Sequence, residues 1–109
     1  MWNLYGVGSL EIKEAQDLVY EHLERIGYTE SETEPTHAFL HLVEELGETS
    51  RSLLHRETER KKFENRTEAG TLKKEVGDIL WQTMKLASYL DIDLEEAFKE
   101  VLEKNRNKN

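Results

Sequence analysis

The spacing of apolar residues constrains the fold of this chain more than any other feature, because they recur at intervals of three and four along most of its length. Ile12, Ala15, Val19, Leu23 and Ile26 form the first such stripe. This period is typical of an amphipathic helix, whereas a half-buried strand would show strict alternation. No segment shows that alternation convincingly, so the sequence predicts an all-α fold.

Turn and capping residues set the ends of the first two predicted helices. Ser9 is expected to cap a first helix over about residues 10–26, and Gly27 is expected to end it. Pro35, the only proline, suits the first turn of a second helix that continues to about Arg56.

Two further helices are expected in the second half of the chain. The highly charged segment 57–70 is interpreted as a loop, and a third helix is expected over residues 71–90. Asp93 and Glu96 form a capping box at the start of the last helix. The apolar residues expected to face the core from the second and last helices are Phe39, Leu42, Val43, Leu46, Leu53 and Leu54, and Leu94, Ala97, Phe98, Val101 and Leu102.

Composition limits the core that these helices can build. Of 109 residues, 37% are hydrophobic and 35% are charged, which is a lean core for a single domain spanning residues 1–109. Lean cores are often completed by a partner chain. The sequence therefore predicts a four-helix bundle that is completed by homo-oligomerisation.

Charge and cysteine content exclude several classes of protein. Fifteen basic against 23 acidic side chains give a net charge of −8 with no basic stripe, so nucleic-acid polymers are not expected partners. The absence of cysteine excludes a disulfide scaffold and thiolate metal sites. No apolar run is long enough for a membrane span, and residues 1–10 lack the features of a signal peptide. A cytoplasmic location is expected.

The second and third predicted helices carry similar acidic strings. Glu44-Glu45-Leu46-Gly47-Glu48 lies in the second helix, and Glu75-Val76-Gly77-Asp78 lies in the third. In each string two carboxylates stand three residues apart, so they share one side of the helix. A glycine inside a helix costs about 1 kcal/mol relative to alanine. Close approach of the two helix backbones is therefore expected at both glycines.

A solvated acidic face is the simplest interpretation of these strings, since an E-E-x-x-E pattern arises by chance roughly once in so acidic a chain. Like charges at this spacing destabilise a helix, however, and few basic residues lie nearby to offset them. The string also occurs twice, on helices expected to be antiparallel neighbours. Each stripe continues into side chains capable of chemistry, namely His41, Glu45, Glu48, Ser52 and His55 on the second helix and Glu75, Asp78, Gln82 and Lys85 on the third.

If the two stripes face each other, Glu45, Glu48, Glu75 and Asp78 converge. Four negative charges in a partly dry groove require protonation or cations. Oxygen ligands select Mg²⁺ or Mn²⁺ over zinc, and Mg²⁺ points to a phosphorylated substrate and a metal-activated water. A di-iron bundle would need a Glu-x-x-His string on each of two helices. The chain offers only residues 34–37, at a helix start, which excludes that alternative.

The order of these motifs resembles that of the MazG-like all-α nucleoside triphosphate pyrophosphohydrolases, whose signature is E-E-x-x-E followed by E-x-x-D. The resemblance covers nearly the whole chain and implies a four-helix MazG-like bundle. Lys104-Asn105 resembles the C-terminal K-N element with which this family contacts phosphate. Lys108 stands where the family usually has an arginine.

The resemblance implies hydrolysis of a ribo- or deoxynucleoside triphosphate to the monophosphate and pyrophosphate. It also implies Mg²⁺ held by Glu45, Glu48, Glu75 and Asp78, with Glu48 as the expected general base. A homodimer or homotetramer follows from it, with sites that include residues of a neighbouring chain. Housecleaning of non-canonical nucleotides is a role that this activity would serve, while the base, the sugar and the number of metal ions stay open.

Several residues near the stripes have two interpretations. His55 either contacts the nucleotide base or is a half-exposed histidine at a helix end. His41 is expected to support the metal ligands or to be a plain surface residue, rather than to bind the ion. Glu44 is expected to support the metal ligands. Trp81 is expected in the core or a subunit interface rather than stacked on a base. The aromatic residues ahead of the first helix that could cover a nucleotide or a neighbouring chain are Trp2 and Tyr5.

Two alternative functions stay open. A non-catalytic helical module could use the acidic groove to receive a basic partner or to store metal. Within the same superfamily, phosphoribosyl-ATP pyrophosphohydrolase is the other alternative, although the Ser-Tyr-Thr stretch expected before its metal motif is absent. Pyrophosphate release from a panel of nucleotides, with and without Mg²⁺, would discriminate between them.

Overall fold

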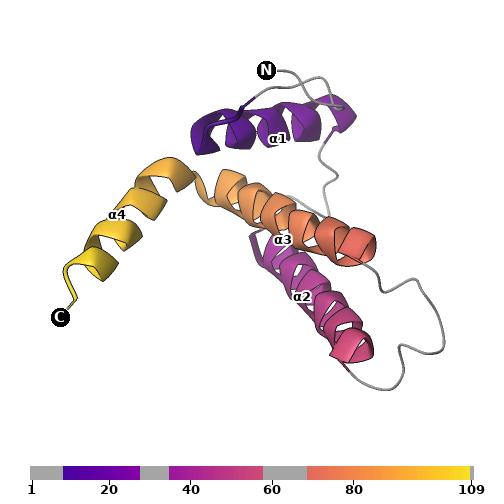
Figure 1. Cartoon of the computed structure of the whole chain (residues 1–109). Coiled ribbons are helices and arrows are strands. Elements are labelled where there is room, and N and C mark those ends of the chain that lie inside the picture. Colours follow the sequence, from indigo (N-terminus) through magenta and orange to yellow (C-terminus); the bar gives the residue numbers. More distant parts are fainter. Residues whose placement is uncertain (1–8, 28–34, 58–68, 109) are drawn as a thin grey trace.

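The structure, a computed structural model, describes residues 9–27, 35–57 and 69–108. These described residues form four α-helices and no strand (Figure 1). The all-α prediction is therefore confirmed. The bounds of the four helices are Ile12–Ile26 for α1, Pro35–Glu57 for α2, Ala69–Leu90 for α3 and Leu94–Arg106 for α4.

The first helix starts later than predicted and ends where predicted. Glu11, not Ser9, is the N-cap, because its backbone N–H donates to Oε1 of Glu14 at 2.9 Å and the chain turns into the helix there. Gly27 ends the helix with a φ of 75°, in the left-handed region that favours glycine, and its N–H donates to the carbonyl of Glu24 at 3.1 Å.

The remaining ends agree closely with the sequence pattern. α2 begins at Pro35 as predicted, whereas α3 begins at Ala69, so the expected loop over residues 57–70 is shorter at both ends. Residues 58–68 of that loop lie outside the described residues. Asp93 caps α4 as predicted, since its Oδ1 accepts hydrogen bonds from the backbone N–H groups of Glu95 at 3.0 Å and Glu96 at 3.2 Å.

The helices are arranged around α3 (Figure 1). α2 and α3 form the most extensive contact, α1 packs on α3, and α4 touches α1. α2 and α3 run antiparallel, because His41 near the start of α2 contacts Lys85 near the end of α3. α4 turns away from the α2–α3 pair beyond its contact with α1, and its C-terminal end lies far from them in Figure 1.

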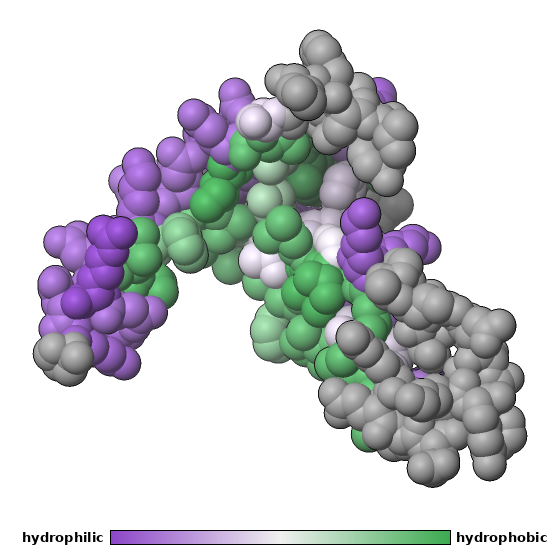
Figure 2. Space-filling view, viewed as in Figure 1, coloured by the Kyte–Doolittle hydropathy of each residue, from purple (hydrophilic) through white to green (hydrophobic). Residues whose placement is uncertain are grey.

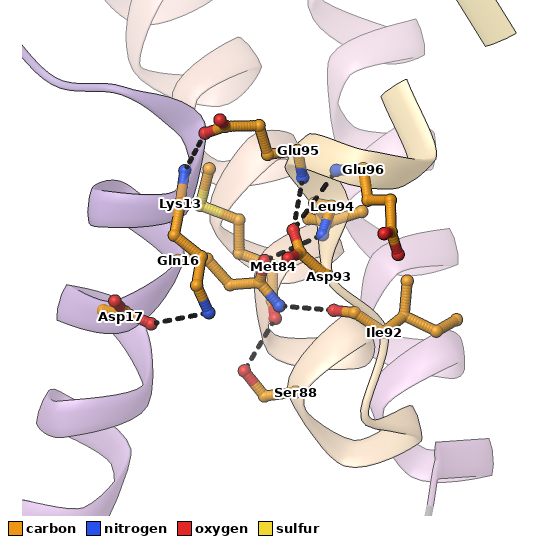
Figure 3. A network of polar contacts seen from close by, with 10 residues as sticks. All are labelled: Lys13, Gln16, Asp17, Met84, Ser88, Ile92, Asp93, Leu94, Glu95 and Glu96. Atoms are coloured by element: carbon orange, nitrogen blue, oxygen red, sulfur yellow. Dashed lines mark hydrogen bonds and ion pairs between the residues drawn. The ribbon is translucent and has the colours of Figure 1, made fainter. Parts of the chain in front are cut away.

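One buried amide fixes the connection between α3 and α4 to α1 (Figure 3). Gln16 is 7% exposed; its Nε2 donates to the carbonyl of Ile92 at 2.7 Å, and its Oε1 accepts from the N–H of Leu94 at 2.9 Å. Asp91, with a φ of 58°, makes the left-handed turn that ends α3. The apolar period of the first helix gives no sign that Gln16 is buried.

The core of the described chain is small. It lies between α1 and α3, where Val19, Leu23 and Met84 are buried and Ala15 and Leu94 pack against them. None of the large side chains in the described ranges is fully buried. The buried apolar residues are Val19, Leu23, Ala38, Leu72, Met84 and Ala87.

Much of the predicted core is exposed, and this part of the prediction is wrong for a single chain. Phe39 is 52% exposed on α2, and Phe98 is 54% exposed on α4. The amphipathic pattern is present on both helices, but none of the described elements of the same chain covers these sides. Nor does any described helix combine the length and apolar character needed to cross a membrane. The other predicted core residues that are exposed are Val43, Leu46, Leu53, Leu54, Val101 and Leu102.

Candidate functional site

The acidic residues of α2 and α3 act on one another electrostatically. The pKa of Glu45 is raised above its ordinary value, first because burial at the helix contact removes it from water. The negative charges of Glu48, Asp78, Glu75 and Glu44 raise this pKa further, in that order. Two of these charges come from the other helix, so the two acidic strings converge on Glu45.

Some carboxylate oxygen atoms at this contact have no hydrogen-bond donor among the described residues. Glu45, Glu75 and Asp78 are half-buried, while Glu44 and Glu48 are exposed. Oε1 of Glu45 and Oε1 of Glu75 are buried, and neither finds a hydrogen-bond partner among the described residues. A buried carboxylate oxygen without a partner is costly, and a cation or an external donor would relieve that cost.

These oxygen atoms suit a hard divalent cation in their chemistry. An all-oxygen donor set is the one that Mg²⁺ and Mn²⁺ prefer. Within the part of the chain that the structure describes, no three acidic or histidine side chains form a cluster that would hold an ion unaided. The carboxylates of the two helices therefore offer oxygen ligands for an ion, but they do not form a complete coordination shell by themselves.

A buried lysine and a histidine join the helices beside the carboxylates. Lys85 is 5% exposed, and its Nζ lies 3.3 Å from Nδ1 of His41, which precedes Glu45 by one helical turn. Nζ of a lysine ammonium carries donors only, so in this contact the ring nitrogen of His41 would be the acceptor. The sequence placed Lys85 on the acidic stripe but assigned it no role; the structure shows that it packs α3 against α2.

Other polar groups extend the site along both helices. Oε1 of Gln82 and Nδ1 of His55 are buried, and the described residues offer neither a hydrogen-bond partner. Thr49 is 9% exposed, and its hydroxyl donates to the backbone carbonyl of Glu45 at 2.9 Å. Thr49 was not among the predicted site residues, although its position four residues after Glu45 places it on the same stripe.

The two glycines of the acidic strings do not serve the predicted purpose. A Cβ atom built on Gly47 or on Gly77 would meet no atom within 4 Å. Both glycines are exposed, so the expectation that they allow the backbones of α2 and α3 to approach closely is wrong. The reason is geometric: both glycines are exposed, whereas Glu45, Glu75 and Asp78 are the residues of the two strings that are half-buried.

The predicted phosphate-binding residues lie apart from the carboxylates. Lys104 and Asn105 are exposed in the last two turns of α4. Because α4 diverges from α2 and α3, one chain does not bring these residues to its own acidic site (Figure 1).

Trp81 lies on the side of α3 that faces α1. It is 37% exposed, and its ring meets that of His22 edge-on, with centroids 5.3 Å apart and an interplanar angle of 73°. Trp81 was predicted in the core or in a subunit interface; the first location is only partly correct, and the second stays a prediction. An apolar groove with a volume of about 240 Å³ runs beside it, lined by Leu10, Ala15, Leu18, Val19, Gly77, Leu80, Trp81 and Met84.

Comparison with known proteins identifies the family. Residues 33–109 match the MazG nucleotide pyrophosphohydrolase domain, and this range contains both acidic strings. The chain therefore belongs to the family of MazG nucleotide pyrophosphohydrolase domains. The resemblance inferred from the two motifs is confirmed.

A bacterial relative is similar over part of the chain. The uncharacterized protein YpjD of Bacillus subtilis (strain 168) is 41% identical over 63 residues, which is 58% of this chain and 56% of the relative. The aligned region thus spans little more than half the length of that relative. No solved structure matches the chain significantly.

Proposed function

We propose that this chain hydrolyses ribo- or deoxynucleoside triphosphates to the monophosphate and pyrophosphate, with Mg²⁺ or Mn²⁺ as cofactor. One observation carries the proposal: within a domain of this family, the carboxylates of α2 and α3 converge on Glu45 and leave buried oxygen atoms of Glu45 and Glu75 without partners. Housecleaning of non-canonical nucleotides is the cellular role that we propose for this activity.

Four side chains would hold the metal, namely Glu45, Glu48, Glu75 and Asp78. When bound, Mg²⁺ would neutralise the charge of the triphosphate and favour attack of water on phosphorus. Without the ion, these carboxylates repel one another and would also repel the substrate. Glu44 is exposed on α2, where its negative charge acts on Glu45 from outside the proposed ligand set.

Glu48 is the proposed general base. It is exposed on α2 and lies within electrostatic reach of Glu45, so it is open to water and substrate where the more buried ligands are not. The oxygen of the attacking water forms a bond to the α-phosphorus, and the bond from that phosphorus to the bridging oxygen breaks. Glu48 accepts the proton of the water, and pyrophosphate leaves.

Three further residues are proposed to bind the nucleotide. His55 lies on α2 beyond Glu48, and its buried Nδ1 would bond to the base. Lys104 and Asn105 would bind phosphate; because α4 turns away from the acidic site of its own chain, they would reach the site of a neighbouring copy.

Pyrophosphate release from a panel of standard and modified nucleoside triphosphates, with and without Mg²⁺, tests the proposal. We expect Mg²⁺-dependent release and its loss by a factor of at least 10³ in Glu48→Gln, with unchanged helicity. Glu24→Gln, an exposed acid on α1, is the matched control and should keep full activity. Silence across the whole panel from a folded, Mg²⁺-loaded sample would overturn the proposal in favour of a non-catalytic acidic module.

Metal binding has its own readout. Thermal unfolding with increasing Mn²⁺ should show a stabilisation of about 1.4 kcal/mol when the ion is present at ten times its Kd. The double variant Glu45→Gln, Glu75→Gln should lose this stabilisation while keeping its fold in EDTA. An undiminished stabilisation in that variant would place the ion elsewhere.

A further inference from the structure

Few large apolar side chains fix the position of α2 along α3. The buried residues of α2 are the small Ala38 and Thr49, and Leu42 is the one large apolar side chain that is half-buried among those that the structure describes on this helix. The other large ones, such as Leu46, are exposed, and Figure 2 shows apolar surface open over α1, α3 and α2. Packing that lacks interlocking large side chains loses its unique arrangement before it loses stability. The register of α2 against α3 therefore needs another determinant.

The acidic strings do not hold this register without a cation. Burial is the first cause of the raised pKa of Glu45, and among the charges that follow it those of Asp78 and Glu75 come from α3. The two strings therefore repel each other across the contact, and a slide of α2 along α3 would relieve the repulsion. An attractive contact elsewhere on the two helices must oppose that slide.

Lys85 and His41 supply such a contact. Nζ of Lys85 lies 3.3 Å from Nδ1 of His41, and Lys85 is only 5% exposed. A buried ammonium that loses an acceptor is costly, so registers that move His41 away from Lys85 are disfavoured. A single polar residue in an apolar helix interface fixes the register of coiled coils in the same way. Because His41 precedes Glu45 by one helical turn, an error in this contact displaces the carboxylate directly.

We propose that Lys85 is a positioning residue, whose contact with His41 sets the register in which the acidic strings of α2 and α3 face each other. The inference rests on the proposed function, because the geometry that it explains is that of the proposed metal site. Lys85 acts through His41 and not on the ion, since its own positive charge repels a cation.

Mn²⁺ affinity separates this role from a purely electrostatic one. Loss of a nearby positive charge would by itself tighten the binding of a cation. In the double variant His41→Phe, Lys85→Met, we expect instead that the dissociation constant for Mn²⁺, measured from the EPR signal of the free ion, rises by about 10-fold or more. The midpoint of urea unfolding in EDTA should not fall, because apolar groups of similar size replace the polar pair. Lys99→Met, which removes a 72% exposed positive charge from α4, is the control and should bind Mn²⁺ as the parent does.

Pulsed EPR measures the register in the absence of metal. Thr36 and Lys74 are exposed near the starts of α2 and α3, so they lie towards opposite ends of the antiparallel pair. The chain has no cysteine, so spin labels at Thr36→Cys and Lys74→Cys are the only ones, and dilution with unlabelled chain isolates the distance within one chain. We expect one narrow distance in the parent. In the double variant the distribution should broaden or move by about 5.4 Å, which is one helical turn.

His41→Gln keeps the inference testable if the double variant does not fold. Gln restores an acceptor that His41→Phe lacks, so it should keep the narrow distance and bind Mn²⁺ at least about 10-fold more tightly than His41→Phe does. An unchanged distance in the variants without the contact would overturn the inference, and so would a changed distance with undiminished Mn²⁺ affinity. If the parent neither binds Mn²⁺ nor hydrolyses nucleotides, the proposed function fails, and the distance alone decides whether Lys85 sets the register.

Discussion

Burial at the contact between α2 and α3 raises the pKa of Glu45, and the negative charge of Asp78 across that contact raises it further. The two residues are far apart in sequence and belong to separate acidic strings. Their electrostatic interaction is what turns two helical motifs into one candidate site. In the absence of a cation, the same interaction lowers the free energy of unfolding by an amount that can be measured.

Removal of the charge on Glu45 should stabilise the metal-free chain at neutral pH. The folded state holds this proton more tightly than the unfolded chain, in which the ordinary pKa is 4.5. The stability linked to this proton is therefore fully present below pH 4.5 and is lost as the pH rises through the raised pKa of the folded state. We expect Glu45→Gln to raise the free energy of unfolding at pH 7 and to flatten its decline with pH, as measured by urea denaturation in EDTA.

Glu100→Gln is the control for net charge, since it removes one negative charge from an exposed position on α4. It should change the free energy of unfolding by no more than about 0.5 kcal/mol. Equal gains from both substitutions would show that the self-repulsion of an acidic chain, and not the surroundings of Glu45, is being relieved.

Loss of the contact between His41 and Lys85 should weaken the packing of α2 on α3. His41→Phe keeps the ring shape but removes the acceptor that lies 3.3 Å from Nζ of the buried lysine. We expect a loss of about 1 kcal/mol in the free energy of unfolding. His37→Phe, exposed one turn earlier on the same helix, should have little effect. Both are measured at one fixed protein concentration, because association would add to stability; equal losses would contradict the role assigned to this contact.

Gly47→Ala should stabilise the chain. The glycine lies inside α2, and an added Cβ would meet no atom within 4 Å. The gain should be about 0.5–1 kcal/mol in the free energy of unfolding, because alanine is the better helix former. Ser50→Ala, also exposed on α2, should gain less. If Gly47→Ala raises stability but lowers turnover, the glycine leaves room for substrate. A loss of stability would mean instead that another chain packs against Gly47.

Local signals explain why the helices were predictable. Pro35, Gly27 and Asp93 act within a turn of their own position, so the ends that they set could be inferred from neighbouring residues alone. The prediction of Ser9 as the cap was wrong because the carboxylate of Glu14 accepts a hydrogen bond from the backbone N–H of Glu11. Serine is a common cap, so residue type alone did not show that Glu11 would take this position.

Long-range features of the site were only partly predictable. The repeated acidic strings predicted that Glu45 and Asp78 would converge, since facing stripes follow from antiparallel helices. The pairing of Lys85 with His41 depends on the register of α2 against α3, which no local pattern fixes. The exposure of Phe98 was missed for a different reason, because periodicity shows that one side of a helix is apolar but not whether the same chain covers it.

Gln16→Leu should loosen α4, because the Gln16 amide makes two hydrogen bonds to the connection that leads into that helix. Leucine has a similar volume but leaves the carbonyl of Ile92 and the N–H of Leu94 without these partners. We expect a loss of about 2 kcal/mol in the free energy of unfolding. Hydrogen exchange at the Leu94 amide should become faster by at least 10-fold, whereas Glu21→Ala, exposed on α1, should leave it unchanged.

This substitution also separates the roles of the helices in the proposed reaction. α4 carries Lys104 and Asn105, whereas the carboxylates lie on α2 and α3. A looser α4 should therefore raise KM for the nucleotide several-fold and leave kcat nearly unchanged, because the phosphate contacts weaken while the groups that act on water stay in place. Steady-state kinetics with Mg²⁺ at saturation measures both constants. An equal fall in kcat would show that α4 takes part in the chemical step.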